Sequence, residues 1–518
     1  MMSSGVPPRT VVAGQILTVL LVGAVTCPAF TMQDVVARAK ELAAQPYQAP
    51  PTIPDGLRKL TYDQYQSIRF KPERSLWRAS HGSFQVAFMS PGLYYAHPVK
   101  INVVDAAGVH AVPYDKDSFT YPSAAVAAVV PPDLGFAGFK LTYPLNGPQQ
   151  HDQFLVFAGA SYFRGVGTDN VFGLSGRGIA VDTGLLSGEQ FPVFTEFWLV
   201  RPSPDAHAVE FYGLLVGQSL TGAYRFVAYP DTPTVLQVQA QLFFRNDVKL
   251  LGLAPLTSMF YYGENTVRPA AEWRPQVHDS DGLLVHDAAT GEWLWRPLLN
   301  PLQLEMDDFE TRRLGGFGLL QRQRRFSEYE DAGAVYERRP SAWVEPVGDW
   351  GKGSVTLVQL PAPNENSDNM VAFWTPATEP AAGTSLKVSY RVGFGWDAMT
   401  GEPMGRARQT FVGSGNVVGG GDVAGAYRVV VDFVGGPLGG LAEDAAVRAM
   451  VTPERGGKVI HQAVTYLAPC RCWRLSMLVA PASGSSLALR AYLKNGDDTL
   501  TETWTYRLPA NNRISPGS

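Results

Sequence analysis

Residues 234–244 read TVLQVQAQLFF, an apolar run that lies between Pro233 and the polar triplet 245–247. A run of this length, bounded by turn-forming residues, is typical of a β-strand. Other short apolar and aromatic runs occur at 84–89, 154–157, 224–228 and 355–360. The chain also carries 52 Gly and 39 Pro residues, which favour tight turns between strands. The sequence therefore predicts a mainly β fold.

The length of 518 residues exceeds what one hydrophobic core usually supports, so we expect two domains. Residues 413–421 read GSGNVVGGG, which indicates a linker over 396–421. The strand-like runs that follow fit a small sandwich of immunoglobulin type over 422–518, although the Cys…Trp…Cys pattern of that fold is missing. The larger β domain is expected over 30–395.

The first 29 residues have the pattern of a secretory signal peptide. A charge-free apolar run at 10–26 is followed by the small residues Cys27 and Ala29. We expect cleavage after Ala29 and export from the cytoplasm. An uncleaved membrane anchor is the alternative, because the run is only just long enough to span a bilayer. One helix is expected next, from about Asp34, which caps it, to Ala44.

Net charge and cysteine spacing exclude two kinds of site. The formal net charge of −4 argues against a nucleic-acid partner, whose phosphates would require a basic surface. Cys470 and Cys472 are two residues apart, and a bond between them would close a small, strained ring. Two thiols alone also make a poor metal site. We therefore expect no disulfide here and interpret both cysteines as residues on one face of a strand.

The middle of the chain concentrates aromatic and acidic residues. Aromatic faces stack on the apolar C–H surfaces of sugars, and paired carboxylates carry out glycoside hydrolysis. Turn-like sequences rich in carboxylates are HDSDG at 278–282 and NENSDN at 364–369. From pattern alone, an equally good interpretation is that the aromatics fill a core and the acids cap turns. Six of the eleven tryptophans lie in this region: Trp273, Trp293, Trp295, Trp343, Trp350 and Trp374.

Other chemistries find little support. The eight histidines are scattered, and neither H-E-x-x-H nor C-x-x-C occurs. GLSGR at 173–177 lacks the last glycine of a nucleophile elbow, and the glycine-rich 413–421 lacks the lysine of a phosphate loop. DSDG at 279–282 lacks the later ligands of a calcium loop. No metal and no cofactor are expected.

Longer motifs resemble the periplasmic glucans biosynthesis protein G/D family. They occur in one order along nearly the whole chain after the signal peptide, which makes the resemblance specific. The motifs are SYFR at 161–164, FGLSGRGIAVDT at 172–183, GEQFP at 188–192, TGAY at 221–224, APLTSMF at 254–260, HDSDG at 278–282, GEW at 291–293, GFGLLQR at 316–322, RPSAW at 339–343, GKG at 351–353 and DNMVA at 368–372.

The resemblance implies a large amino-terminal sandwich of the galactose-mutarotase type, an immunoglobulin-like carboxy-terminal domain and a location in the periplasm. It also implies a role in making osmoregulated glucans with a β-1,2-linked backbone. Members of the family resemble β-1,2-glucanases that invert the anomeric carbon or transfer the chain to another sugar. The expected partners are the β-1,2-glucan polymer and an inner-membrane glucosyltransferase.

Four catalytic residues follow from the same resemblance. Asp368 is expected as the general acid and Asp279 as the general base. Tyr336 would relay a proton or hold a substrate hydroxyl, and Glu365 would tune the pKa of its neighbour Asp368. Asp281 is expected to have a structural role, because an aspartate before glycine commonly caps a turn. An inverting hydrolase would hold its two acids about 6.5–9.5 Å apart, or farther apart with a relay.

The substrate-binding residues are expected to be Arg338 and four tryptophans that form the walls of a groove: Trp293, Trp295, Trp343 and Trp374. Two functions remain open at this point. The first is a glucan hydrolase or transglycosylase. The second is a non-catalytic factor that guides nascent glucan from the membrane enzyme, with the carboxy-terminal sandwich as its docking module.

Overall fold

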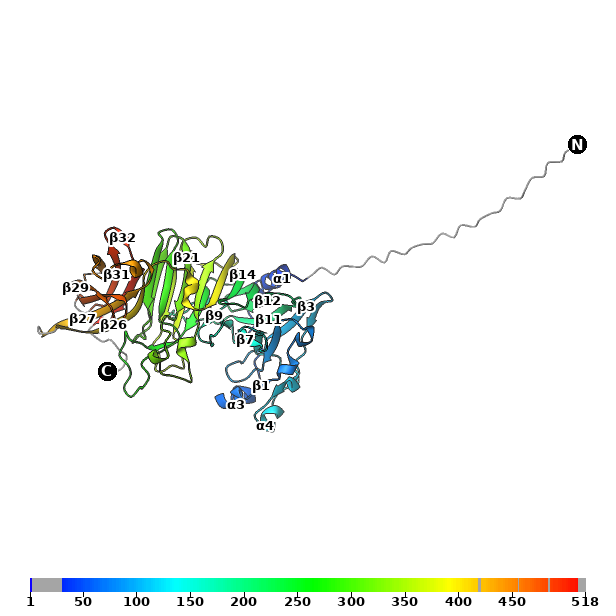
Figure 1. Cartoon of the computed structure of the whole chain (residues 1–518). Helices are drawn as coiled ribbons and strands as arrows, with labels where there is room; N and C mark the ends of the chain where they lie inside the picture. Colours follow the sequence, from blue (N-terminus) through cyan, green and yellow to red (C-terminus); the bar gives the residue numbers. More distant parts are fainter. Residues whose placement is uncertain (2–29, 418–420, 455, 483–484, 511–518) are drawn as a thin grey trace.

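The computed structural model describes residues 1, 30–417, 421–454, 456–482 and 485–510. The signal peptide predicted over 1–29 therefore lies almost wholly outside the described residues. The chain is mainly β, as predicted. Figure 1 shows the amino-terminal part, in blue and cyan, at one end of the molecule and the carboxy-terminal part, in orange and red, at the other. Among the described helices, none is long and apolar enough to cross a membrane.

Two large sheets build most of the structure, and the larger one also takes in strands from the carboxy-terminal part. The first has ten strands. In spatial order it contains β2 (Gln85–Met89), β6 (Gly138–Tyr143), β7 (Asp152–Ala158), β8 (Tyr162–Gly165), β9 (Ser175–Arg177), β15 (Leu251–Ser258), β24 (Met370–Pro376), β23 (Gly353–Gln359) and β20 (Glu305–Thr311), with β10 (Ala180–Val181) paired to β15.

The second sheet has fifteen strands. In spatial order it contains β28 (Val447–Pro453), β31 (Leu487–Asn495), β33 (Thr503–Leu508), β19 (Glu292–Pro297), β18 (Gly282–Asp287), β21 (Leu314–Leu320), β22 (Ser341–Pro346), β25 (Ser385–Gly395), β14 (Thr234–Phe244), β13 (Leu220–Tyr229), β12 (Val209–Val216), β11 (Val193–Val200), β3 (Lys100–Asp105) and β4 (Gly108–Ala111), with β32 (Asp498–Thr499) paired to β31.

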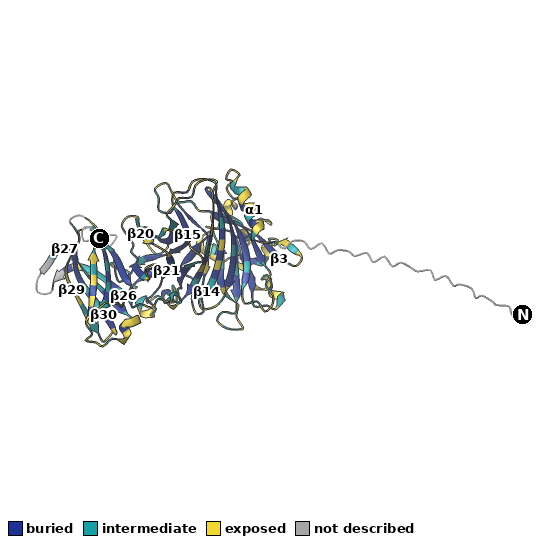
Figure 2. Ribbon diagram, turned by 90° about the horizontal axis from the view of Figure 1, so that it is seen from above, coloured by how far each residue is buried: buried dark blue, intermediate teal, exposed yellow. Residues whose placement is uncertain are grey.

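The two sheets pack face to face through apolar side chains. Ring centroids of Phe157 on the first sheet and Phe226 on the second lie 5.0 Å apart, and those of Phe139 and Phe211 lie 5.5 Å apart. Side chains alternate along each strand, so one face of each sheet is available for this core. Figure 2 shows the buried residues as dark strands inside the sandwich. The strand predicted at 234–244 is confirmed as β14, which lies near the centre of the larger sheet.

Short helices and ribbons complete the described structure. They are α1 (Met32–Ala43), α2 (Asp55–Arg58), α3 (Tyr62–Gln66), α4 (Ala124–Ala128), the two-stranded ribbons β1 (Arg69–Phe70) with β5 (Phe119–Thr120) and β16 (Phe260–Tyr262) with β17 (Val277–His278), and the 3-10 turns η1 (Pro72–Arg74), η2 (Arg78–Ser80), η3 (Lys116–Ser118), η4 (Phe326–Glu328), η5 (Tyr336–Arg338), η6 (Asp397–Thr400) and η7 (Gly436–Gly440).

The early helix α1 begins before the predicted cap. Thr31 caps it, with its side chain accepting from the Gln33 amide, and Asp34 accepts from the Thr31 amide at 2.7 Å. This is a capping box, in which the acidic residue occupies the third helical position and the hydroxyl residue the cap. Val35 and Ala39 are buried against the outer face of the fifteen-stranded sheet.

The segment predicted as a linker, 396–421, is largely structured. It contains η6 and most of β26 (Arg406–Val417), which pairs with β27 (Gly421–Val434). With β30 (Cys472–Ala480) and β29 (Lys458–Leu467) these strands form a four-stranded sheet. One of the glycines that indicated flexibility serves close packing here, because a Cβ on Gly415 would lie 2.7 Å from the Cβ of Ala426, whereas a Cβ on Gly413 would meet nothing within 4 Å. The linker prediction is therefore wrong for residues 406–417.

The carboxy-terminal strands join the larger sheet directly. Strand β33 pairs in parallel with β19, with Leu294 opposite Thr503 and Trp295 opposite Trp504. Arg322 reinforces this junction, since its buried guanidinium donates to Glu502 at 2.6 Å and lies 3.3 Å from Glu402. The same guanidinium stacks 3.6 Å from the centroid of a Trp295 ring. The two parts of the chain therefore share a sheet and a core.

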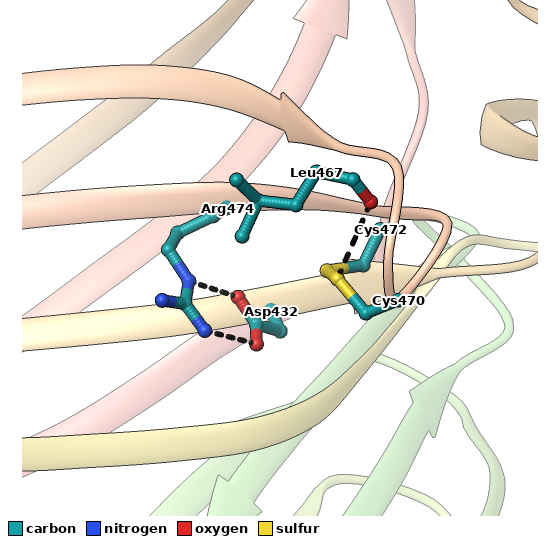
Figure 3. Close-up of a disulfide and its surroundings, with 5 residues drawn as sticks. All are labelled: Asp432, Leu467, Cys470, Cys472 and Arg474. Atoms are coloured by element: carbon teal, nitrogen blue, oxygen red, sulfur yellow. Dashed lines mark hydrogen bonds and ion pairs between the residues drawn. A yellow bond between two sulfur atoms is a disulfide. The ribbon is translucent and has the colours of Figure 1, made fainter.

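Cys470 and Cys472 form a disulfide at the turn between β29 and β30, contrary to the sequence prediction (Figure 3). Only Cys472 belongs to a strand, because the chain turns between the two cysteines and brings their sulfur atoms together. Asp432 lies beside them and is paired with Arg474 through two hydrogen bonds of 2.7 and 2.8 Å. Because both sulfurs are in the disulfide, this group does not offer thiolates to a metal.

Candidate functional site

Asp368 stands where the loop after β23 returns to the sheet as β24. The next residue, Asn369, is 2% exposed and fixes this point of the chain. Its side-chain oxygen accepts from the Phe260 amide at 2.9 Å, and its amide donates to the carbonyls of Phe260 and Leu360 at 3.0 Å each. The Asp368 side chain itself is 39% exposed. The loop is thus anchored by a buried amide while the neighbouring carboxylate reaches the surface.

A groove of about 580 Å³ lies over the outer face of the ten-stranded sheet, and Asp368 lines it. Strand alternation places Phe157 and Phe163 in the core and turns Tyr162 and Arg164 toward the groove. Arg164 is held by a 2.8 Å hydrogen bond from Nε to the Ser175 hydroxyl. Its Nη2 lies 3.8 Å from the Asp368 carboxylate. The aromatic side chains along this groove are those of Tyr94, Tyr95, Tyr162 and Phe172.

Asp279 follows β17 and is 4% exposed. Its carboxylate accepts a hydrogen bond from the guanidinium of Arg339. Burial raises the pKa of Asp279, the Arg339 charge opposes that rise, and the negative charge of Asp368 adds to it. The two predicted catalytic carboxylates are therefore close enough to interact electrostatically. A buried carboxyl with a raised pKa is suited to accept a proton near neutral pH.

Tyr336 and Glu365 form the adjoining part of the site. The Tyr336 hydroxyl donates to Glu365 at 2.8 Å, and the Arg339 guanidinium lies 4.3 Å from the centroid of the Tyr336 ring. Burial and the bond to Glu365 raise the pKa of Tyr336, so the phenol stays protonated. Arg339 thus touches both Asp279 and Tyr336. Three of the four predicted catalytic residues belong to one connected polar network.

Arg274 holds Glu365 from the other side. Its Nη1 donates to Glu365 at 2.5 Å and to Asp331 at 3.1 Å, and its Nη2 donates to Glu272 at 2.8 Å. The hydrogen bond from Arg274 lowers the pKa of Glu272 to about 2. Glu365 therefore has two firm partners, Tyr336 and Arg274, and this cluster of charges stabilises the loop that leads to Asp368.

Asp281, for which the sequence predicts a structural role, has contacts that hold the backbone in place. Its carboxylate accepts hydrogen bonds from the backbone amides of Arg322 and Gln323, the latter at 2.9 Å. These bonds join the HDSDG turn to the end of β21. The same turn thus presents Asp279 to the site on one side and is fixed by Asp281 on the other.

The four tryptophans expected as groove walls are buried in the protein core, with 1–8% of their surfaces exposed: Trp293, Trp295, Trp343 and Trp374. Trp293 stacks on His286, with ring centroids 4.1 Å apart, and lies 5.8 Å from Trp343. Neighbouring glycines make room for these rings, since a Cβ on Gly316 would lie 2.4 Å from the Trp343 ring. The prediction that they stack on substrate is therefore wrong.

Arg338 is exposed beside Tyr336, and its Nε donates to the Asp169 carbonyl at 2.9 Å. Its role toward a substrate stays a prediction. Sequence reasoning missed Arg164, Arg274 and Arg339, which place the carboxylates, and the clamp made by Asn369. Arg164, Arg339 and Asn369 lie in the quoted motifs and Arg274 lies four residues before HDSDG, but only their contacts show what they do.

The fold and this groove define a β-sandwich protein whose open groove combines tyrosines, the cation Arg164 and the carboxylate of Asp368, with Asp279 buried nearby. The chain belongs to the periplasmic glucan biosynthesis protein family MdoG, whose sequence model matches residues 30–508. It is 45% identical over 486 residues to glucans biosynthesis protein G of Ralstonia nicotianae, covering 93% of this chain and 96% of the relative.

A second relative shows the same extent of similarity. Glucans biosynthesis protein G of Dickeya dadantii is 42% identical over 490 residues, covering 93% of this chain and 94% of the relative. Among solved structures, the Slr1438 protein of Synechocystis matches 50% of this chain and 93% of its own, with a TM-score of 0.17 and 7% identity. That similarity is too low to support any inference about fold or function.

Proposed function

We propose that this protein acts in the periplasm on the β-1,2-linked backbone of osmoregulated glucans, as a glycoside hydrolase or transglycosylase that inverts the anomeric carbon. The observation that carries the proposal is the half-exposed carboxylate of Asp368, which lines the open groove 3.8 Å from Arg164. The buried Asp279 supports it, since Arg339 holds its carboxylate and the charge of Asp368 raises its pKa further. Family membership and the relatives named glucans biosynthesis protein G support the substrate class.

The proposed reaction uses the two carboxyls on opposite sides of the bond that breaks. Asp368, the more exposed of the two, donates a proton to the glycosidic oxygen as the C1–O bond breaks. Water, or a hydroxyl of a second sugar, attacks C1 from the opposite face and gives its proton to Asp279. The protonated phenol of Tyr336 lies between Glu365 and Arg339, where it can orient the attacking oxygen or relay that proton.

The second candidate is a non-catalytic factor that binds nascent glucan and passes it on from an inner-membrane glucosyltransferase. One observation favours it: Asp279 is buried and already paired with Arg339, as a purely structural carboxylate would be. In that function the groove holds the polymer and the carboxylates only shape it. The carboxy-terminal sandwich would then serve as the docking module.

Incubation of the mature protein with linear β-1,2-glucan distinguishes the two. The catalytic proposal expects shorter chains by size-exclusion chromatography, and loss of shortening in Asp279→Asn and in Asp368→Asn. Asp444→Asn, at an exposed position of the carboxy-terminal part, is the matched control and should cleave like the wild type. Binding of the polymer with no change in chain length would reject catalysis and support the second candidate.

A further inference from the structure

A second hollow, of about 1040 Å³, continues from the groove that Asp368 lines. The two share five lining residues: Gln66, Met89, Tyr95, Lys140 and Gln153. Its floor is the outer face of β2 and β6, and its rim carries the ribbon of β1 and β5 and the turn η2. A chain lying in the groove can therefore extend into this hollow.

The hollow is basic, although the whole chain has a net charge of −4. Arg69, Arg78 and Lys140 line it together with His81 and His151, and no aspartate or glutamate is among its lining residues. Within the described residues, neither arginine nor Lys140 forms an ion pair with a carboxylate. These three cations are therefore not neutralised by a direct ion pair among the described residues, although Asp152 partly offsets the positive charge near His151.

Positively charged side chains face one another inside this hollow. Burial lowers the pKa of Lys140, and the neighbouring charge of Arg69 lowers it further. Burial likewise lowers the pKa of His151, with the charge of Arg78 as the next cause, against a smaller opposing effect of Asp152. The Asp152 carboxylate accepts hydrogen bonds from Asn146 and Gln150, both at 2.9 Å. Repulsion between cations destabilises the empty hollow, and a bound anion would relieve it.

Buried polar groups make up the floor between these cations. Gln85 and Thr142 are each 9% exposed, and the Gln85 amide nitrogen lies 3.3 Å from Nε2 of His151. Amide and hydroxyl groups in a recessed floor suit sugar hydroxyls, whereas a flat bilayer surface would meet only the rim. The recess and its continuity with the groove favour a substituted sugar chain over a membrane surface.

We propose that this hollow binds an anionic group, a phosphate or a carboxylate, carried by the glucan chain. The inference rests on the proposed function and extends it, since a neutral glucose polymer offers these cations hydrogen-bond acceptors but no negative charge. The protein should therefore prefer a glucan with anionic substituents over the unsubstituted polymer. Arg69 and Arg78 determine this preference, and the carboxylates at Asp279 and Asp368 are independent of it.

The test measures binding by isothermal titration calorimetry in the Asp368→Asn background, which prevents turnover. The probes are linear β-1,2-glucan, the same glucan carrying succinyl half-esters, and the same glucan carrying phosphate esters. We expect the anionic glucans to bind about tenfold more tightly at low salt, the effect of one charge-assisted hydrogen bond. High salt should reduce the difference. The two anionic probes show whether carboxylate or phosphate is the better ligand.

Arg69→Gln/Arg78→Gln should remove most of the preference, measured as the ratio of the affinities for anionic and neutral glucan. Arg69→Lys/Arg78→Lys keeps the charges and should keep the preference. Arg391→Gln/Arg448→Gln, at exposed strand positions far along the other sheet, is the matched control and should bind like its parent.

Equal affinity for neutral and anionic glucan would overturn the inference, as would a preference that survives in Arg69→Gln/Arg78→Gln. Failure to bind any of the three glucans would instead reject the proposed function. Binding to phosphatidylglycerol vesicles that is lost in the double variant, without any preference among glucans, would also overturn it and assign the hollow to a membrane surface.

Discussion

Replacing Arg339 by glutamine tests the chemistry of the site through its pH dependence. The guanidinium donates to the Asp279 carboxylate, and the side chains are only 20% and 6% exposed. An opposite charge at this range lowers the pKa of a carboxyl by about 1–3 units. Its removal should raise the pKa of Asp279, already raised by burial, by the same amount. Each unit corresponds to about 1.4 kcal/mol.

The sign of the effect on activity follows from the role of Asp279 as the base. The base must be deprotonated, so the acidic limb of the kcat/KM profile follows its pKa. In Arg339→Gln this limb should move to higher pH by about 1–3 units, with activity recovering above it. Arg339→Lys keeps a positive charge and should shift the limb much less. Direct titration of the Asp279 carboxyl by NMR should show the same displacement.

A different result would refute this reasoning. If Arg339→Gln lowered kcat/KM equally at every pH and left the acidic limb in place, Arg339 would only maintain structure. An unchanged limb together with an unchanged NMR titration of Asp279 would show that the charge of Arg339 does not control the carboxyl.

Three further predictions concern the scaffold. Arg322→Met leaves the charge of Glu502 buried without its cation and should lower the free energy of unfolding in urea by about 3–5 kcal/mol, whereas exposed Arg391→Met should change it by less than about 0.5 kcal/mol. If both variants lost the same amount of stability, Arg322 would contribute no more than an exposed arginine. The pKa of Glu402 is raised to about 10 by burial and by Glu502, so the folded state keeps a proton that the unfolded state releases above its ordinary pKa of 4.5. Wild-type stability should then fall as pH rises toward 10. Glu402→Gln cannot lose a proton at this position, so its Tm should change less than that of the wild type between pH 5 and 9. Parallel plots of Tm against pH for the two proteins would contradict this. Asn369→Ala removes three hydrogen bonds and should lower the free energy of unfolding by about 2–4 kcal/mol. Turnover should also fall, because the loop that carries Asp368 loses its anchor. Full activity with unchanged stability would show that Asn369 does not hold this loop in place.

The strands were the most predictable part of the fold. Residues 234–244 form β14 within the bounds that the run indicated, because apolar residues on its buried face alternate with polar residues on the other face, where Gln237 and Gln239 are exposed. The linker was mispredicted since composition cannot distinguish glycine used for flexibility from glycine used for close approach, as at Gly415. The parallel pairing of β19 with β33 joins segments about two hundred residues apart, and no local pattern encodes it.

The cysteines and tryptophans show a related limit. Spacing alone argued against a Cys470–Cys472 bond, but the turn between β29 and β30 brings the two sulfurs together. Dense tryptophan was interpreted as a sugar-binding surface, whereas Trp293, Trp295 and Trp343 pack in the core that the two parts of the chain share. A large aromatic ring suits both environments, and only the neighbouring strands decide which one it occupies.

The sequence motifs named the carboxylates of the candidate site but not the cations that contact them, and the catalytic roles of the carboxylates stay predictions. Asp279, Tyr336, Glu365 and Asp368 were identified from motifs, and the structure brings them into electrostatic or hydrogen-bond contact. The arginines Arg274 and Arg339 bridge loops separated by sixty residues or more, at Asp279 and at Glu365. Such bridges depend on tertiary structure, so they follow from the fold and not from any local sequence.

The most direct test of the central claim is the anomeric configuration of the first product released from linear β-1,2-glucan, followed by proton NMR before mutarotation equilibrates it. Action of Asp368 as acid and Asp279 as base in a single displacement predicts that the α-anomer appears first and that Asp368→Asn releases none. A β-anomer as the first product, or an unchanged product profile in Asp368→Asn, would contradict the account.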